Sequence, residues 1–351
     1  MEIDAETIRP GVVGMLRANL GVQAGESVLV VTDVPTPEQW EEWPVSQLEE
    51  AFRRAALARR VAEIAAEELP ACAVGFLAYP ATGRSGSEPG REVAARLREA
   101  NVVVAITSFS LSHTHAREGA CRAGARVASM PRFVPEMFYP DGPLAVDYRR
   151  IAQETARIAA CLTAARVATV RSPAGTDLEF SLEGREGRVD DGLYLRPGMW
   201  GNLPGGEAYI APVEGTAEGV LAVEPGWHHR LVEPMRLVFS GGTVVAVDGG
   251  GEVGEHLRGL LGMEGRQPTA EERARRHLAE LGVGTNPNAR RTDITLEAEK
   301  IKGTVHVAIG DNSHMGGANV ADYHADFVVP RATLLLDGQV VMDEGRWTFG
   351  W

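Results

Sequence analysis

The sequence predicts an α/β N-terminal domain with a parallel sheet, followed by a mixed, mainly antiparallel β (α+β) domain. A chain of 351 residues is longer than one hydrophobic core usually supports. The first half alternates aliphatic strands with long amphipathic helices, and the second half consists of short strands joined by glycine turns. We therefore expect a Rossmann-like domain over residues 1–165 and a β-rich domain over residues 166–351.

The first half contains aliphatic runs with few polar interruptions. Such runs are typical of parallel strands that are buried on both faces. Helical stretches such as VSQLEEAFRRAALARRVAEIAAEEL and REVAARLREA separate them, as in a sheet wrapped by helices. The expected strands are ESVLVVTD, ACAVGFLAY, NVVVAITSF and ARVASMP.

The second half has the pattern of successive hairpins. MRLVFSGGTVVAVDGG and ATLLLDGQVVMDEG each place GG or DG between two short strands, which indicates a tight turn. One helix is expected over TAEERARRHLAELG, where Thr269 and Glu272 form a capping box and Gly282 would end the helix. Glu280 would then lie in the last helical turn beside free carbonyl groups, where either a bound cation or exposure to solvent would offset the unfavourable charge.

Composition and charge exclude several classes of partner. A net charge of −13 argues against nucleic acid and anionic membranes, whose phosphates require clustered Lys and Arg, but it is compatible with cations. No apolar run approaches the roughly 20 residues that span a bilayer. The acidic N-terminal segment MEIDAETIRPGVV is unlike a signal peptide, so we expect a cytoplasmic protein.

Residues of the metal-ligating types occur at conspicuous places in the second half. His324 and Asp326, in DYHADFVV, would project from the same face of a strand. His306 lies among small and apolar residues in GTVHVAIG, Glu207 follows a Pro-Gly-Gly turn, and Glu280 is placed at the expected helix end. Two imidazoles and three carboxylates suit two divalent cations such as Zn, Co or Mn, provided that the fold brings them together.

Other polar residues have weaker claims to a site. His113 and His115 follow the strand NVVVAITSF, at the strand end where α/β sheets place their clefts, and are candidates for contact with a substrate. A hydrogen bond at a helix start is the alternative for either histidine. Glu297 and Glu299 alternate on an expected strand, so we expect both to lie on a solvated face.

Ordered motifs between residues 204 and 348 resemble those of a known family. These motifs are PGGEAYIAP, the Glu280 position, HVAIG, HADF and the terminal DGQVVMDEGRW. Their order, their approximate spacing and the layout in two parts resemble the thermophilic metallo-aminopeptidases grouped with aminopeptidase T, aminopeptidase II and staphylococcal aminopeptidase S.

The resemblance implies a dinuclear metal site in a homodimer. Glu207, Glu280, His306, His324 and Asp326 would be the ligands, and a metal-activated water would remove N-terminal residues from small peptides. Glu280 and Glu207 would be the catalytic residues, with Glu280 serving as both ligand and proton relay. The expected activity is therefore that of a metallo-aminopeptidase, a hydrolase.

The chain departs from the family pattern close to these ligands. The family carries a tyrosine where this chain has Ser313, and its usual Asp-Glu-Asn is here Ala298-Glu299-Lys300. The interval from His306 to His324 is also shorter. Ser313 and the neighbouring His314 are therefore candidates for substrate contacts, and His314 is a substitute for the missing tyrosine.

A different reaction class is the main alternative. The fold also resembles that of 2,5-dihydroxypyridine dioxygenase, a single-iron enzyme with a facial triad of two histidines and one carboxylate, a set that His306, His324 and Asp326 would satisfy. In that enzyme the position of Glu280 is a histidine and the position of Glu207 lacks its glutamate, so both glutamates favour two metals. A non-catalytic metal-binding relative is the third possibility.

Overall fold

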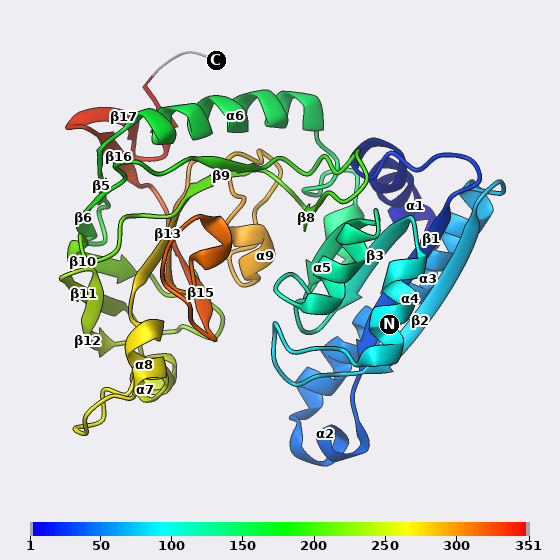
Figure 1. Ribbon diagram of the computed structural model, residues 1–351, viewed down its shortest axis with the longest axis horizontal. Helices are drawn as coiled ribbons and strands as arrows, with labels where there is room; N and C mark the ends of the chain where they lie inside the picture. The colour runs from blue at the N-terminus through cyan, green and yellow to red at the C-terminus, as the bar shows by residue number, and fades with distance from the viewer. Residues whose placement is uncertain (1–2, 349–351) are drawn as a thin grey trace. The chain divides into compact units, whose positions relative to one another are not determined.

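The computed structural model describes residues 3–348, and the chain divides into two compact units. The first unit runs to Tyr148 and includes Gly192–Gly205, and the second comprises Arg149–Asp191 and the chain from Gly206 onward. An α/β unit with a parallel sheet and a β-rich unit are thus present, as expected (Figure 1). The units differ from the expected ranges 1–165 and 166–351, because helix α6 packs into the second core and residues 192–205 return to the first sheet.

The first unit is built on a parallel sheet, sheet A, in the order β2-β1-β3-β4-β8. Leu29, Val31 and Val103 face a cluster that includes residues of α4 and α5. The alternate residue Val30 points the other way and is also buried, and helix α3 packs against β1, β2 and β3. The strands of sheet A are β1 (Ser27–Val34), β2 (Ala73–Pro80), β3 (Val102–Thr107), β4 (Arg126–Pro131) and β8 (Trp200–Asn202).

Helices follow the strands of sheet A, as the sequence pattern indicates. The two helical stretches quoted for the first half form α3 and α4. The helices are α1 (Ala5–Gly14), continued by a π-helical turn (Met15–Asn19), α2 (Pro37–Glu42), α3 (Val45–Glu68), α4 (Arg91–Glu99), α5 (His115–Arg122) and a 3₁₀ turn (Pro135–Phe138).

The second unit contains the antiparallel sheets B and C. Sheet B has the order β12-β11-β10-β6-β5-β16-β17-β18, and sheet C has the order β15-β14-β13-β9-β7. Sheet B consists of β5 (Val167–Arg171), β6 (Asp177–Ser181), β10 (Glu218–Val223), β11 (Met235–Ser240), β12 (Thr243–Gly249), β16 (Thr333–Leu336), β17 (Gln339–Asp343) and β18 (Arg346–Trp347). Sheet C consists of β7 (Arg188–Asp190), β9 (Glu207–Ile210), β13 (Leu278–Gly284), β14 (Val305–Gly310) and β15 (His324–Val329).

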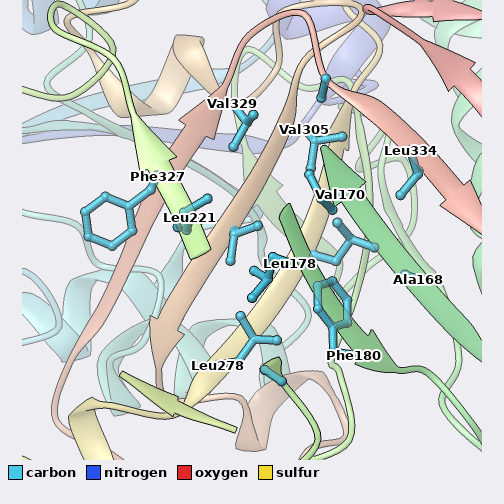
Figure 2. Close-up of a cluster of buried hydrophobic side chains, with 14 of the residues drawn as sticks. Ala168, Val170, Leu178, Phe180, Leu221, Leu278, Val305, Phe327, Val329 and Leu334 are labelled. Atoms are coloured by element: carbon cyan, nitrogen blue, oxygen red, sulfur yellow. The ribbon is translucent and has the colours of Figure 1, made fainter. Parts of the chain in front are cut away.

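Sheets B and C share one hydrophobic core. Leu178 and Phe180 of β6 and Leu221 of β10 meet Val305 of β14 and Phe327 of β15 in this core (Figure 2). Each strand supplies these residues at every second position, so the intervening residues of sheet C point away from the core. The helices of the unit are α6 (Tyr148–Ala164), α7 (Gly251–Leu260), α8 (Ala270–Arg275) and α9 (Thr295–Ala298), and a 3₁₀ turn spans Ser313–Met315.

The helix expected over residues 269–282 is mostly wrong. Its capping box is confirmed, because the Thr269 hydroxyl accepts from the backbone of Glu272 and the Glu272 side chain accepts from the backbone of Thr269. The helix ends at Arg275, however, and strand β13 (Leu278–Gly284) follows. Leu278, Leu281 and Val283 are buried in the core between the sheets, and this burial outweighs the helical propensity of the local sequence.

Within residues 3–348, every helix is too short or too polar to span a lipid bilayer.

Candidate metal centre

The expected ligands lie on the face of sheet C that points away from the hydrophobic core. They come from β9, β13, β14 and β15, which are neighbours in the sheet although they are distant in the sequence. In the strand register each ligand has a small residue directly across from it. The pairs are Glu207 with Gly284, His306 with Gly282, Glu280 and Asp326 with Ala308, and His324 with Gly310.

A β-bulge directs Glu280 to this face. The register of β13 against β14 shifts between Leu278 and Glu280, so one extra residue, Ala279, is inserted. Without the shift, Leu278 and Glu280 would point the same way, because side chains two positions apart share a face. The bulge lets Leu278 enter the core while Glu280 joins the ligands.

Gly282 makes room for one imidazole and does not end a helix. It pairs across the strands with His306. A Cβ atom added at Gly282 would overlap the Nε2 and Cε1 atoms of the His306 ring. Glycine is therefore required here by the close approach of a side chain, and a residue that the sequence suggested as a helix signal belongs to the site.

The first group of ligand atoms belongs to Glu280, His324 and Asp326, whose donor atoms lie within 4.8 Å of one another. His324 Nε2 is 3.3 Å from Glu280 Oε2 and 3.4 Å from Asp326 Oδ1. The other ring nitrogen, Nδ1, is 2.8 Å from the backbone carbonyl oxygen of Asp311 and can donate to it. This hydrogen bond fixes the ring and leaves Nε2 available to a metal, which is the usual outer support of a metal-bound histidine.

The second group comprises Glu207, Glu280 and His306, so Glu280 belongs to both groups. His306 Nε2 lies 3.3 Å from Glu280 Oε1 and 3.4 Å from Glu207 Oε2. Among residues 3–348, His306 Nδ1 and Glu207 Oε2 are buried and have no hydrogen-bond partner. The triad expected for an iron enzyme consists of His306, His324 and Asp326. In the structure these three residues do not form one group, because Glu280, and not His306, lies with His324 and Asp326.

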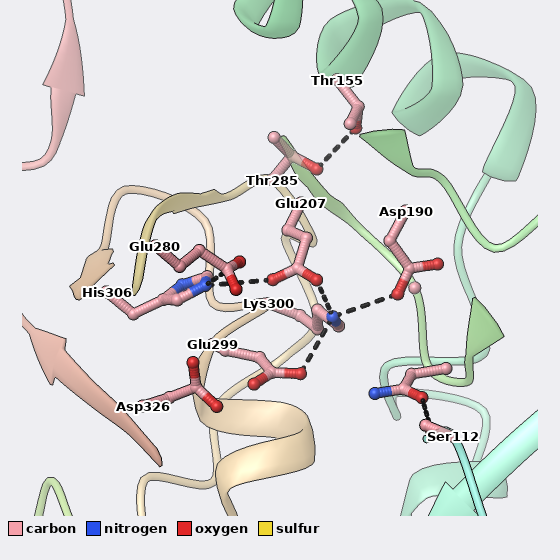
Figure 3. Close-up of polar contacts among 12 residues, drawn as sticks. Ser112, Thr155, Asp190, Glu207, Glu280, Thr285, Glu299, Lys300, His306 and Asp326 are labelled. Carbon is pink, nitrogen blue, oxygen red and sulfur yellow. Dashed lines mark hydrogen bonds and ion pairs between the residues drawn. The ribbon is translucent and has the colours of Figure 1, made fainter. Parts of the chain in front are cut away.

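A buried ammonium group adjoins the second group (Figure 3). Lys300 Nζ lies 2.5 Å from Glu207 Oε1, 2.9 Å from Glu299 Oε1 and 3.2 Å from Asp190 Oδ2. The Lys300 side chain is completely buried. The sequence predicted no role for Lys300 or Asp190. The only signal was a lysine next to glutamate in LEAEKIKG, where the aminopeptidase pattern has an uncharged residue.

The carboxylates and imidazoles shift one another's protonation. Burial by itself raises the pKa of Glu280 and of Asp326, but the adjacent histidines lower both pKa values below their ordinary range. Burial lowers the pKa of His324, and Asp326 and Glu280 raise it well above its ordinary value. For Glu207, burial raises the pKa and the Lys300 ammonium opposes that shift. The ionised carboxylates therefore make this face of sheet C attractive to cations.

A tyrosine that the sequence interpretation missed shares the ligand face. Tyr209 lies two positions after Glu207 on β9 and pairs with Gly282 across the strands. Burial raises the pKa of Tyr209 above its ordinary value, and the carboxylates of Asp190, Glu280 and Glu207 raise it further. Its phenol therefore stays protonated beside the cluster.

The loop after β14 brings His314 close to the first group. The His314 and His324 ring centres are 5.8 Å apart, and His314 Nδ1 lies 3.0 Å from Asp311 Oδ1. The Ser313 hydroxyl donates to the same Asp311 carboxylate. The role of His314 and Ser313 in contacting a substrate stays a prediction. The His314 ring lies beside the ring of the candidate ligand His324.

The remaining candidates lie elsewhere. His113 and His115 are exposed residues of the first unit, where His113 contacts the ring of Trp200 edge-on and His115 begins helix α5. Their contact with a substrate stays a prediction. The expectation for Glu297 and Glu299 is wrong, because both are buried: Glu297 accepts from backbone N–H groups at the turn before α9, and Glu299 pairs with Lys300.

The donor set of the first group fits a divalent transition metal. It offers one imidazole nitrogen and two carboxylates without a thiolate, a combination that suits Fe, Mn or Zn and leaves coordination positions open for a substrate. Buried carboxylates at such short separation also call for a cation, because their mutual repulsion is weakly screened. The role of these residues as metal ligands stays a prediction that the geometry makes specific.

Comparison with known proteins assigns a family. The model of the family described as NicX: 2,5-dihydroxypyridine 5,6-dioxygenase matches residues 16–349. A 2,5-dihydroxypyridine 5,6-dioxygenase of Pseudomonas putida KT2440 is 26% identical over 273 residues, which cover 73% of each chain.

Solved structures show the same fold. The 2,5-dihydroxypyridine dioxygenase of Pseudomonas putida KT2440 superposes with a TM-score of 0.71 at 19% identity, over 99% of both chains. AmpT from Thermus thermophilus superposes with a TM-score of 0.63 at 16% identity, over 98% of this chain and 99% of its own. The fold is therefore shared by a dioxygenase and by AmpT, and it does not distinguish their reactions.

The expected aminopeptidase activity is wrong. The matching family and the curated relative are dioxygenases, which are oxidoreductases. The expected hydrolase and protease assignments are therefore wrong as well. The motifs misled because they encode a strand framework that solved structures of both kinds of protein share, together with a face of possible metal ligands in this chain. Such a face can activate water or dioxygen, and the ligand types alone do not decide between them.

Proposed function

Because the chain belongs to the 2,5-dihydroxypyridine 5,6-dioxygenase family, we propose that it is a metal-dependent dioxygenase that opens the ring of 2,5-dihydroxypyridine or a close hydroxylated analogue. The observation that carries the proposal is the family match over residues 16–349, together with the ligand group of Glu280, His324 and Asp326. The reaction breaks the bond between ring carbons 5 and 6 and places both atoms of O₂ in the product. The ring is oxidised and O₂ is reduced, so no separate reductant is needed.

Glu280, His324 and Asp326 would hold one divalent iron. When bound, this ion would supply coordination sites for dioxygen and for the substrate hydroxyl groups. The Asp311 carbonyl holds the His324 ring in one orientation, and the β-bulge holds the Glu280 carboxylate on the ligand face. These supports position the donors before any substrate arrives.

The neighbouring pair of His306 and Glu207 would handle the proton of the substrate. A hydroxylated pyridine releases a proton when its hydroxyl group is activated, and Glu207 Oε2, which lies 3.4 Å from His306 Nε2, would accept it. Burial of both side chains keeps water away from these atoms. His314, beside His324, is the corresponding candidate for contact with the substrate ring.

The activity is tested with the purified protein reconstituted with ferrous iron under anaerobic conditions. We expect consumption of one O₂ for each 2,5-dihydroxypyridine lost, measured with an oxygen electrode and by the ultraviolet absorbance of the ring. Glu280→Gln should lower both iron content and turnover by at least a hundredfold, because it removes the carboxylate shared by the two ligand groups. Glu183→Gln, at an exposed glutamate paired with Arg166, is the matched control and should retain both. Absence of oxygen uptake with hydroxylated pyridines in the iron-loaded protein would contradict the proposal.

A further inference from the structure

Two hydrogen-bond donors lie side by side on the ligand face, outside the two ligand groups. Arg188 of β7 and Tyr209 of β9 are directly opposite each other in the strand register. Asp190 is two positions after Arg188 on β7, and its carboxylate lies 3.2 Å from Lys300 Nζ on the ligand face. Side chains two positions apart in a strand share a face, so Arg188 and Tyr209 both lie on this side of sheet C. Side chains paired in this way are close enough to act on one group of a ligand.

The Tyr209 hydroxyl has no acceptor among residues 3–348. The charges of Asp190, Glu280 and Glu207 raise the pKa of the phenol, so the phenol lies near these carboxylates, although none of them accepts from it. Asp190 and Glu207 accept from the Lys300 ammonium instead. The Tyr209 side chain is half-buried, and a hydroxyl that is partly removed from water is unfavourable until an acceptor binds it.

A contact with the loop after β14 holds the Arg188 guanidinium. Its Nη1 donates to the backbone carbonyl of His314 at 3.2 Å. The centres of the His314 and His324 rings are 5.8 Å apart, so one loop residue contacts both Arg188 and a candidate metal ligand. A guanidinium has five N–H donors, and within the described part of the chain the other donors of Arg188 have no acceptor.

An acceptor from outside the chain suits these two donors. The ligand groups offer imidazoles and carboxylates, which suit a cation, and the three N–H donors of Lys300 are occupied by three carboxylates. Arg188 and Tyr209, in contrast, can donate to an oxygen of a substrate. Strand β9 is next to β13, which carries Glu280, and neighbouring strands lie about 4.8 Å apart. A small ring at the first ligand group is therefore within reach of the phenol.

We propose that Arg188 and Tyr209 form a donor pair that recognises the substrate oxygen on the far side of the ring from the metal. The inference rests on the proposed function and names the part of the substrate that this chain selects. In 2,5-dihydroxypyridine the oxygen on carbon 2 lies across the ring from the hydroxyl on carbon 5, which is next to the bond that breaks. With the hydroxyl on carbon 5 at the first ligand group, the oxygen on carbon 2 accepts from the donor pair. A site built to hydrogen-bond an oxygen rejects the analogue that lacks it.

Two ligands that differ in this one oxygen test the proposal. They are 2,5-dihydroxypyridine and 3-hydroxypyridine, which keeps the hydroxyl for the metal and lacks the oxygen across the ring. Dissociation constants are measured by ultraviolet difference absorbance with the iron(II)-loaded protein under nitrogen, where no turnover occurs. The wild type should bind 2,5-dihydroxypyridine more tightly by about tenfold or more, the effect of hydrogen bonds to one oxygen.

Tyr209→Phe and Arg188→Met each remove one side of the donor pair. Each should weaken the binding of 2,5-dihydroxypyridine by about tenfold and change that of 3-hydroxypyridine by less than about twofold. The iron content should stay at the wild-type value, because neither residue belongs to a ligand group. Arg171→Met, at an exposed arginine of sheet B that pairs with Asp177, is the matched control and should bind both ligands as the wild type does.

The outcomes separate the donor pair from the proposed function. If both ligands bind and either variant keeps the wild-type preference, the donor pair is overturned and the proposed function stands. Equal weakening of both ligands also overturns the donor pair, because a displaced strand, and not a lost donor, would cause it. If neither ligand binds to the iron-loaded wild type, the proposed function and the inference are overturned together.

Discussion

At the scale of single residues, the ligand face depends on the small side chains that separate the ligands. Gly282, Gly284, Ala308 and Gly310 stand across the strands from the ligand residues. Gly282 leaves the space that the His306 ring needs, whereas a Cβ atom at Gly284 or Gly310 would overlap backbone atoms of Ile301 or Tyr323. These glycines carry no chemistry of their own, but they allow the close approaches around the ligand residues.

Gly282→Ala should therefore disrupt the metal centre. The added Cβ atom would overlap the His306 ring, so the ring or the strand has to move. We expect the free energy of unfolding to fall by about 1 to 3 kcal/mol, which is typical of overpacking, and the bound iron to fall below half of the wild-type content. Urea unfolding and metal analysis measure the two effects.

Gly14→Ala is the control for this substitution. Gly14 ends helix α1, and a Cβ atom there meets no atom within 4 Å. The change should leave iron content untouched and raise or maintain stability, because alanine favours the helix. A Gly282→Ala protein with full iron content and unchanged stability would show that the His306 ring is not confined as described.

At the scale of elements, one glutamate makes several of the contacts that hold the loop from Asp311 to Tyr323. Glu214 Oε1 accepts from Asn312 Nδ2 at 2.8 Å and from Ala318 N–H at 2.7 Å, and Glu214 Oε2 pairs with Arg185. Asp311, in this loop, provides the carbonyl that orients His324. The position of a ligand thus depends on a residue in a different segment of the chain.

Glu214→Gln should loosen this loop in a pH-dependent way. Burial raises the pKa of Glu214, but the hydrogen bonds from Ala318 and Asn312 and the charge of Arg185 lower it below its ordinary value of 4.5. A carboxylate with a lowered pKa stabilises the folded state above its unfolded pKa, and this contribution is lost as pH falls through the folded value. We expect the variant to be less stable than the wild type by about 1 to 2 kcal/mol at pH 7, with the difference shrinking below about pH 4.5.

Urea unfolding of both proteins between pH 7 and pH 4 measures this difference. Glu186→Gln makes the same change at an exposed glutamate, and this comparison variant should match the wild type throughout. A constant gap between wild type and Glu214→Gln over the whole pH range would indicate that the amide fails for reasons other than the lost charge.

Strand β13 shows how an element can be decided by its surroundings. TAEERARRHLAELG has a valid helix start at Thr269 and strong helix formers throughout. The chain nevertheless becomes a strand at Leu278, because β9 and β14 supply partners on both sides and the core accepts Leu281 and Val283. A local pattern cannot reveal partners that lie about 70 residues earlier and 25 residues later.

At the scale of the whole molecule, the second unit combines a stable core with a face of concentrated charge. One side of sheet C is packed against sheet B, and the other side gathers carboxylates from several strands. Repulsion among those carboxylates opposes folding, and a bound cation relieves it. Metal binding and stability of this unit should therefore be linked.

Removal of the metal should lower the melting temperature. We expect a chelator to lower it by roughly 5 to 10 °C, and ferrous iron to restore it, because an ion that binds only the folded state stabilises that state. Differential scanning calorimetry measures the shift. Glu280→Gln lacks the shared ligand and should show no response to the chelator. A chelator effect of equal size in that variant would place the stabilising ion elsewhere.

The assembly expected from the sequence is a homodimer, which stays a prediction. Sedimentation velocity at micromolar concentration would give a species of twice the 37.6 kDa chain mass if the prediction is right. A single species with the mass of one chain would contradict it.

Much of the fold follows from the sequence because it depends on local periodicity. The aliphatic runs of the first half and the GG and DG turns of the second half give the parallel sheet and the hairpins, since both signals are contained within about ten residues. The residue types of the ligand face, from Glu207 to Asp326, are equally visible in the sequence.

The amino-acid sequence is enough to predict an α/β unit before a β-rich unit and to identify five residues that could bind metal. Three features become visible in the folded chain alone: Glu280 reaches the ligand face through a bulge, Gly282 makes room for His306, and Lys300 pairs with Glu207. These features depend on contacts between strands that are distant along the chain, where spacing carries no information. Hydrolysis and dioxygen chemistry share the same ligand types, so the family match, and no local pattern, separated them.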